Sequence, residues 1–254
     1  MNKLTSIAFA SSLLVAVACG DVVQPGDADD GADGVNVGSE GAVEYGAIDP
    51  VQPKIIAKSC ADLRAQDPRA EDDDYTLYVG RDEAKPFTAY CQDMASTPRD
   101  YLKLENVQGA FNFSQYTMGG AANGWNVRTY YFYLRFDPET LTVDTSDQTF
   151  TLSEGALNHS ATLQVTSMPY GVAMACGGDG LNGLANINLR GTHFAVADTF
   201  AFVGNGSFGV IASDADMTNI DIEGGGFCGW MAPVNTSWDP MNTAGGVLQL
   251  AYAR

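Results

Sequence analysis

Residues 59–94 read SCADLRAQDPRAEDDDYTLYVGRDEAKPFTAYCQDM, and the order of signals in this stretch predicts the kind of domain that follows. A short helical pattern ends at a proline, and an acidic run then leads into residues 75–79, which have high β propensity. A charged hairpin loop separates these residues from 86–91, which we expect to return as the partner strand. Cys60 and Cys91 lie near the two ends, so a disulfide between them would close the unit.

The first 19 residues have the pattern of an export signal. A single lysine precedes an apolar run that is short for a permanent membrane-spanning helix. The ending Ala-Val-Ala-Cys19 resembles a bacterial lipobox, in which the cysteine becomes the lipidated first residue of the mature protein. The alternative is an ordinary signal cut before Cys19, which would leave a free thiol. Because Gly20 follows the cysteine, we expect an outer-membrane lipoprotein of the cell envelope, facing the periplasm or the outside.

Residues 20–54 are predicted to be a flexible tether. They contain eight acidic residues, recurrent glycine and no Lys or Arg before Lys54. Such a segment buries too little apolar surface to offset the entropy lost on ordering. The sequence therefore predicts a signal peptide at 1–19, an acidic tether at 20–54 and one folded domain at 55–254.

The folded region is predicted to be mainly β. Short runs of alternating or β-branched residues recur between Gly-rich and Pro-containing turns, and the helical pattern at 55–65 is the main helix signal. Residues 127–137 (VRTYYFYLRFD) form the clearest strand, with Tyr131 and Tyr133 on one face and Phe132 and Leu134 on the other. We expect a single compact, sandwich-like β domain with one short N-terminal helix.

The charge of the chain limits its partners. The formal net charge is −18, so nucleic acids and anionic lipid headgroups should be repelled, and membrane contact is expected only through the lipid anchor. Cationic partners and divalent ions remain possible. The same charge would also keep an exported protein in solution.

Several motifs along the chain resemble those of the GON domain, the C-terminal module of one branch of the secreted ADAMTS metalloproteases. The likeness covers residues 58 to about 231 in order. It is carried by YTLY at 75–78, YCQDM at 90–94, NFSQY at 112–116, DPETL at 137–141 and INLRGTHF at 187–194. The animal modules contain more cysteines, so their pairing cannot be transferred whole. The opening of the domain also resembles, more loosely, that of fibrinogen-like domains.

Cysteine number fits an oxidising compartment. If Cys19 is lipidated, four cysteines remain, and four allow three pairings. We favour the connectivity in which each of the two disulfides closes a long loop. The alternative is that the cysteines are free buried thiols. The favoured pairs are Cys60–Cys91 and Cys176–Cys228.

A catalytic constellation is not found in the sequence. The chain has two histidines, His159 in a polar stretch expected to be solvated and His193 expected to be partly buried in a strand, and it has no His-Glu-x-x-His motif. The resemblance is to a module attached to zinc proteases rather than to their catalytic domain, so zinc and peptidase activity are implied by family association alone. The sequence favours a protein that is not an enzyme.

Two sets of residues are candidates for ligand binding. Alternating oxygen donors could hold calcium, although their spacing lacks the glycine and terminal glutamate of an EF-hand; solvated turn acids are the simpler reading. The aromatic side chains of Tyr131 and Tyr133 could form an exposed binding patch or pack against a second sheet. The calcium candidates are Asp214, Asp216, Asp221 and Glu223.

The sequence thus predicts a membrane-anchored, exported accessory domain that binds a protein or glycan at the cell envelope, without a cofactor. One alternative is a zinc-dependent protein associated with a metalloendopeptidase, as the family resemblance implies. The other is a fibrinogen-like carbohydrate binder.

Overall fold

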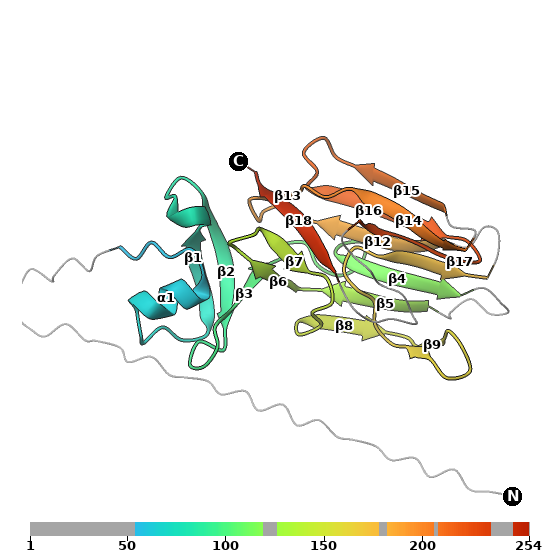
Figure 1. The fold of residues 1–254 in the computed structure, drawn as a ribbon, viewed down its shortest axis with the longest axis horizontal. Helices are drawn as coiled ribbons and strands as arrows, with labels where there is room; N and C mark the ends of the chain where they lie inside the picture. The colour runs from blue at the N-terminus through green and yellow to red at the C-terminus, as the bar shows by residue number, and fades with distance from the viewer. Residues whose placement is uncertain (1–53, 119–125, 178–181, 206–207, 235–245, 254) are drawn as a thin grey trace, which may run out of the picture. The chain divides into compact units, whose positions relative to one another are not determined.

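A computed structural model describes residues 54–118, 126–177, 182–205, 208–234 and 246–253, which belong to one compact unit spanning Gln52–Arg254. The unit is mainly β, as predicted, and its strands form a seven-stranded sheet, a nine-stranded sheet and a small two-stranded ribbon (Figure 1). Within the described residues, no helix has the length and apolar character needed to span a bilayer.

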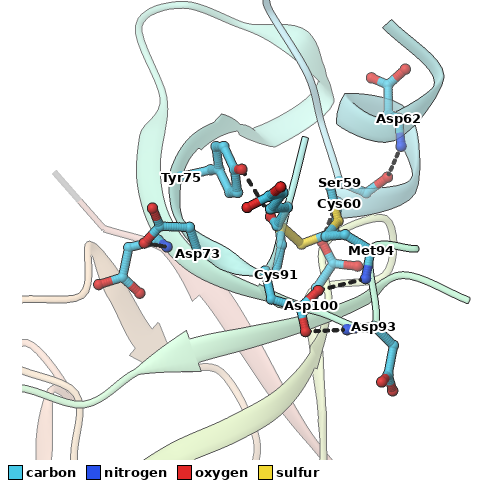
Figure 2. Close-up of a disulfide and its surroundings, with 12 residues drawn as sticks. Ser59, Cys60, Asp62, Asp73, Tyr75, Cys91, Asp93, Met94 and Asp100 are labelled. Carbon is cyan, nitrogen blue, oxygen red and sulfur yellow. Dashed lines mark hydrogen bonds between the residues drawn. A yellow bond between two sulfur atoms is a disulfide. The ribbon is translucent and has the colours of Figure 1, made fainter. Parts of the chain in front are cut away.

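The single described α-helix, α1 (Cys60–Gln66), is attached to the first sheet by a disulfide (Figure 2). The hydroxyl of Ser59 caps the helix by accepting a hydrogen bond from Asp62 N, and the helix ends before Pro68, which cannot continue it. The predicted Cys60–Cys91 disulfide is confirmed. The helix therefore begins at the covalent link that holds it.

The seven-stranded sheet has the order β1-β2-β3-β6-β7-β18-β13, and its neighbouring strands are antiparallel. The predicted hairpin of β1 and β2 lies at one edge, with the short helix η1 (Val79–Arg81) in its loop. The strands are β1 (Asp73–Tyr78), β2 (Pro86–Gln92), β3 (Arg99–Lys103), β6 (Tyr133–Asp137), β7 (Thr142–Asp144), β13 (Phe194–Val196) and β18 (Val247–Tyr252).

The nine-stranded sheet follows the order β14-β17-β11-β4-β12-β16-β15, and β5 and β8 extend it from β4. The pair β11–β4 is parallel, and the other pairs are antiparallel. Its strands are β4 (Phe113–Met118), β5 (Asn126–Tyr131), β8 (Thr151–Glu154), β11 (Ala173–Cys176), β12 (Asn182–Asn188), β14 (Phe200–Asn205), β15 (Phe208–Ser213), β16 (Asn219–Gly225) and β17 (Cys228–Pro233). The two-stranded ribbon contains β9 (Leu157–Asn158) and β10 (Gln164–Val165).

The expectation of one continuous strand over residues 127–137 is wrong. The chain breaks at Phe132 into β5, which belongs to the nine-stranded sheet, and β6, which belongs to the seven-stranded sheet. The buried positions change phase at the break, from Val127, Thr129 and Tyr131 to Leu134 and Phe136. This segment consequently connects the two sheets.

A row of three glycines allows the nine-stranded sheet to fold over on itself. Gly183 on β12 pairs with Gly224 on β16, which in turn pairs with Gly209 on β15. A Cβ atom on Gly183 would lie 2.1 Å from the carbonyl oxygen of Met174 on β11, and one on Gly224 would lie 2.5 Å from the backbone nitrogen of Met231 on β17. The half containing β12, β16 and β15 therefore packs on the half containing β11 and β17 with its backbone far closer than the ~10 Å usual between stacked sheets.

The main hydrophobic core draws buried side chains from both large sheets, including Phe87, Phe136, Phe194 and Ile222. A second cluster lies around Tyr116 and includes residues of the two-stranded ribbon. The second predicted disulfide, Cys176–Cys228, is confirmed and joins the adjacent strands β11 and β17.

Gly183→Ala should lower the free energy of unfolding by about 2–3 kcal/mol, because the added methyl group meets the fixed backbone of Met174 rather than a side chain that could move. Denaturant unfolding with the disulfides intact measures the loss. The matched control is Gly80→Ala, where φ is +62° but no atom lies within 4 Å, so the cost is only about 1 kcal/mol. Equal losses at the two positions would contradict the close packing of the folded sheet.

Candidate functional site

Several of the exposed apolar side chains among the described residues lie on β14 and β15. Phe202 and Val203 on β14 are 59% and 46% exposed, and Val210 and Ile211 on β15 are 58% and 39% exposed. Both strands are at the ends of the main path of the nine-stranded sheet, so each is paired on one side alone. Exposed apolar side chains on strands with one free edge are typical of an interaction surface.

The tyrosine pair suggested by the sequence does not form such a surface. Tyr131 is 1% exposed, donates a hydrogen bond to the carbonyl of Met168 and accepts one from the side chain of Gln148 at 2.8 Å. Of the two alternatives that the sequence leaves open, packing is the one found for Tyr131, because the phase change at Phe132 turns this side chain into the core. Tyr133 is half-buried, with its ring 5.0 Å from that of Phe150.

The four calcium candidates have separate hydrogen-bonding roles. Asp214 accepts hydrogen bonds from Thr218 N and Oγ1 and from Asn219 N, which closes the turn between β15 and β16. Asp221 accepts from the Asn186 amide, Glu223 accepts from the Asn182 amide, and Asp216 is exposed. Within the described ranges, these carboxylates do not form a three-ligand group.

The group of three potential metal ligands found in the described part of the chain is His159 with Cys176 and Cys228. Both sulfur atoms are joined in the disulfide, and Nδ1 of His159 lies 2.6 Å from the hydroxyl of Tyr116. His159 is therefore anchored against the second core cluster rather than free in solvent. His193 was also predicted wrongly, because it is exposed, has a φ of +65° and stacks on Tyr252.

A cleft of about 340 Å³ lies beside α1 and is lined by acidic residues that include Asp100 and Asp137. Burial raises the pKa of Asp100 to about 6, although the hydrogen bond from Cys60 N opposes this effect. Burial also acts to raise the pKa of Asp137, but hydrogen bonds from the backbone of Glu139 and from Thr140 outweigh it and lower that pKa. Opposite shifts of this kind can mark an acid and a base.

The contacts of Asp100 give it a structural role. Its carboxylate accepts the Cys60 amide hydrogen bond at 2.7 Å and so fixes the start of α1 next to the disulfide, as Figure 2 shows. Only 7% of the residue is exposed, and the backbone carbonyl of Asp100 is held by Arg135. A substrate would have little access to this carboxyl group.

The residues that carry the GON resemblance also have structural roles. Asn112 is fully buried with a φ of +47°, and its side-chain oxygen accepts hydrogen bonds from Tyr170 and from Asn188 N. Its side-chain nitrogen donates to the carbonyls of Asn106 and Asn188. A carboxamide with every bond made in the core specifies the packing of its neighbours.

The acidic run before β1 stabilises the turn that follows the second motif cysteine. The carboxylate of Asp72 accepts hydrogen bonds from the backbone nitrogens of Asp93 and Met94. Asp93 has a φ of +58°, so this turn needs such support. Asp72, like Asn112, thus stabilises the fold.

The raised pKa of Asp100 predicts a specific pH dependence. The folded protein retains the Asp100 proton up to about pH 6, whereas the unfolded chain loses it near pH 4, so this contribution to stability is present below pH 4 and is lost as the pH rises through 6. Asp100→Asn, which keeps an acceptor for Cys60 N, should therefore be more stable than the wild type above about pH 7, by on the order of 2 kcal/mol, and equal to it below about pH 4.

Thermal and denaturant unfolding across this pH range measure the difference. Asp137→Asn is the matched control and should have the opposite sign at neutral pH, because the pKa of Asp137 is lowered in the folded protein. A stability difference for Asp100→Asn that does not vary with pH would show that folding leaves the pKa of this carboxyl group unchanged.

The turn role of Asp214 predicts a loss of stability that does not depend on calcium. The hydrogen bond from the Thr218 hydroxyl is the main cause that lowers the pKa of Asp214 to about 2. Asp214→Ala should cost about 1 kcal/mol at neutral pH, and the same loss should be found with calcium or with a chelator. A calcium-dependent rise in Tm that Asp214→Ala abolishes would instead establish a calcium site.

Comparison with known families identifies the domain. A family model described as GON domain matches residues 57–126 and 121–238, which include α1, both disulfides and most strands of the two large sheets. Comparison with curated proteins finds no match, and comparison with solved structures finds none either. The chain belongs to the GON domain family.

Proposed function

We propose that this protein is an exported, lipid-anchored accessory module that binds a partner protein at the cell envelope. The observation that carries the binding role is the exposed apolar surface of β14 and β15, defined by Phe202, Val203, Val210 and Ile211. Isolated exposed apolar residues are common. Four of them on two edge strands that follow each other in the chain would lower solubility, so they favour a binding role.

Two disulfides support the exported location, because such bonds persist in oxidising compartments and are rare in the cytosol. The lipobox-like ending at Cys19 and the acidic tether at 20–54 support an anchored domain with freedom to reach a partner. Cys19 and the tether lie outside the described residues, so their roles rest on the sequence.

A catalytic function and a zinc-dependent function have less support than partner binding. The acidic cleft beside α1 contains Asp100, whose carboxyl group is engaged in holding α1. The cysteines of the three-ligand group are bonded to each other. A carbohydrate-binding role of the fibrinogen-like kind remains the second candidate, and a glycan array with the purified chain would distinguish it from protein binding.

The proposal is tested with the full chain expressed in a bacterial envelope, next to the matched variant Cys19→Ser. The wild type should incorporate labelled fatty acid and sediment with membranes, and the variant should do neither. After chemical cross-linking in intact cells, the wild type should retain a protein partner in a fixed ratio through stringent washing. Absence of a lipid label, or hydrolytic activity that one substitution abolishes, would overturn the proposal.

A further inference from the structure

The exposed apolar side chains lie where the two end strands of the nine-stranded sheet, β14 and β15, come together without pairing. Strands β14 and β15 are joined by residues 206–207, which lie outside the described residues, yet the two strands are not hydrogen-bonded to each other. Instead β14 pairs with β17, and β15 pairs with β16. We call the unpaired boundary between β14 and β15 the seam. Among the described residues, neither strand has a strand partner on that side, which leaves a row of backbone N–H and C=O groups available.

Two side chains face inward at the seam without being covered. Phe202 lies opposite Met231, whose side chain contacts the glycine row, and Ile211 lies opposite Ile222 on the same inner face as Gly209. Met231 and Ile222 are buried, whereas Phe202 and Ile211 are exposed. Phe202 and Ile211 are also equally distant along the chain from residues 206–207. Their exposure therefore results from a missing neighbour at the seam and not from an outward orientation.

On the outer face, acidic residues lie one strand away from the seam, on β16. Val210 is the cross-strand partner of Glu223, and Ala212 is the partner of Asp221, and both acidic residues are exposed. The net charge of −18 adds a general attraction for cations. An occupant of the seam should consequently be apolar toward the inside and basic toward the outside.

We propose that the free edge of β15 binds an extended segment of a partner protein as an added strand. Its alternate apolar side chains would cover Ile211 and Phe202. The long basic side chains between them would lie over Val210 and Ala212 and extend toward Glu223 and Asp221 on the next strand, β16. A strand is the ligand that satisfies a free row of backbone groups, because it carries donors and acceptors at the same spacing, and its side chains alternate between the two faces. This inference rests on the proposed binding function and specifies its site and the chemistry of its partner.

The test uses the full chain with Cys19→Ser and a fluorescent peptide of alternating valine and lysine, with binding followed by anisotropy. Ile211→Lys should weaken binding at least tenfold, because it places a charge where the apolar side chain of the added strand packs. The matched control is Leu152→Lys, an equally large change at an exposed apolar position on β8, which should leave binding unchanged.

Two further comparisons separate strand addition from general attraction. A peptide with proline at alternate positions cannot form the backbone ladder and should not bind, although its charge is the same. Glu223→Gln should weaken the lysine peptide several-fold and leave a peptide with serine in place of lysine unchanged. It also tests the site independently if Ile211→Lys proves to be misfolded. Equal binding of the proline peptide, equal effects of Ile211→Lys and Leu152→Lys, or dimerisation through the seam without peptide binding would each overturn the inference.

The outcome is distinguishable from a failure of the proposed function. If Ile211→Lys still captures the envelope partner as well as the wild type, the protein is a binding module but the seam is not its site. If the peptide binds at the seam while no envelope partner is captured, the site is supported and the proposed function is not.

Discussion

The close approach of two backbones across the nine-stranded sheet determines the shape of this domain. Gly183, Gly224 and Gly209 lie side by side on three strands, and the space that their Cβ atoms would occupy is filled by the backbone and side chains of β11 and β17. Any larger residue at Gly183 or Gly224 would force the two halves of the sheet apart. Because the halves are so close, the sheet curls until its two end strands, β14 and β15, become neighbours without pairing.

Polar groups in the core fix the arrangement that the glycines permit. Asn112 connects the start of β4 to β12 through Asn188 and to the segment before β11 through Tyr170. The break at Phe132 passes the chain from this sheet to the seven-stranded one. Asp100 and the Cys60–Cys91 disulfide then hold α1 against the seven-stranded sheet. Among the residues that make these contacts, Cys91, Asn112 and Asn188 lie in motifs shared with GON domains, so these motifs contribute to the fold.

The sequence predicts the individual helix and strands of this fold better than it predicts which strands pair and which distant residues are in contact. The β1–β2 hairpin, the short helix and the β-rich class are predicted correctly, because each depends on local pattern. The favoured disulfides, Cys60–Cys91 and Cys176–Cys228, are also confirmed. The continuous strand at 127–137 was wrong because alternation cannot reveal a change of phase, which places Tyr131 in the core. The glycine row could not be predicted, since the three residues are neighbours only through strand pairing. His159 and Asp72 were likewise missed, because their partners are distant in the chain.

An open seam explains why apolar side chains that face inward are nonetheless exposed, and it connects the fold to a binding role. Hydrogen–deuterium exchange of the individual backbone amides in β14 and β15 tests this most directly. Amides of β15 that point away from β16, and those of β14 that point away from β17, should exchange rapidly in the free protein, while their neighbours in the same strands are protected. Protection of the outward amides in both strands would mean that β14 and β15 pair with each other, which would contradict an open seam.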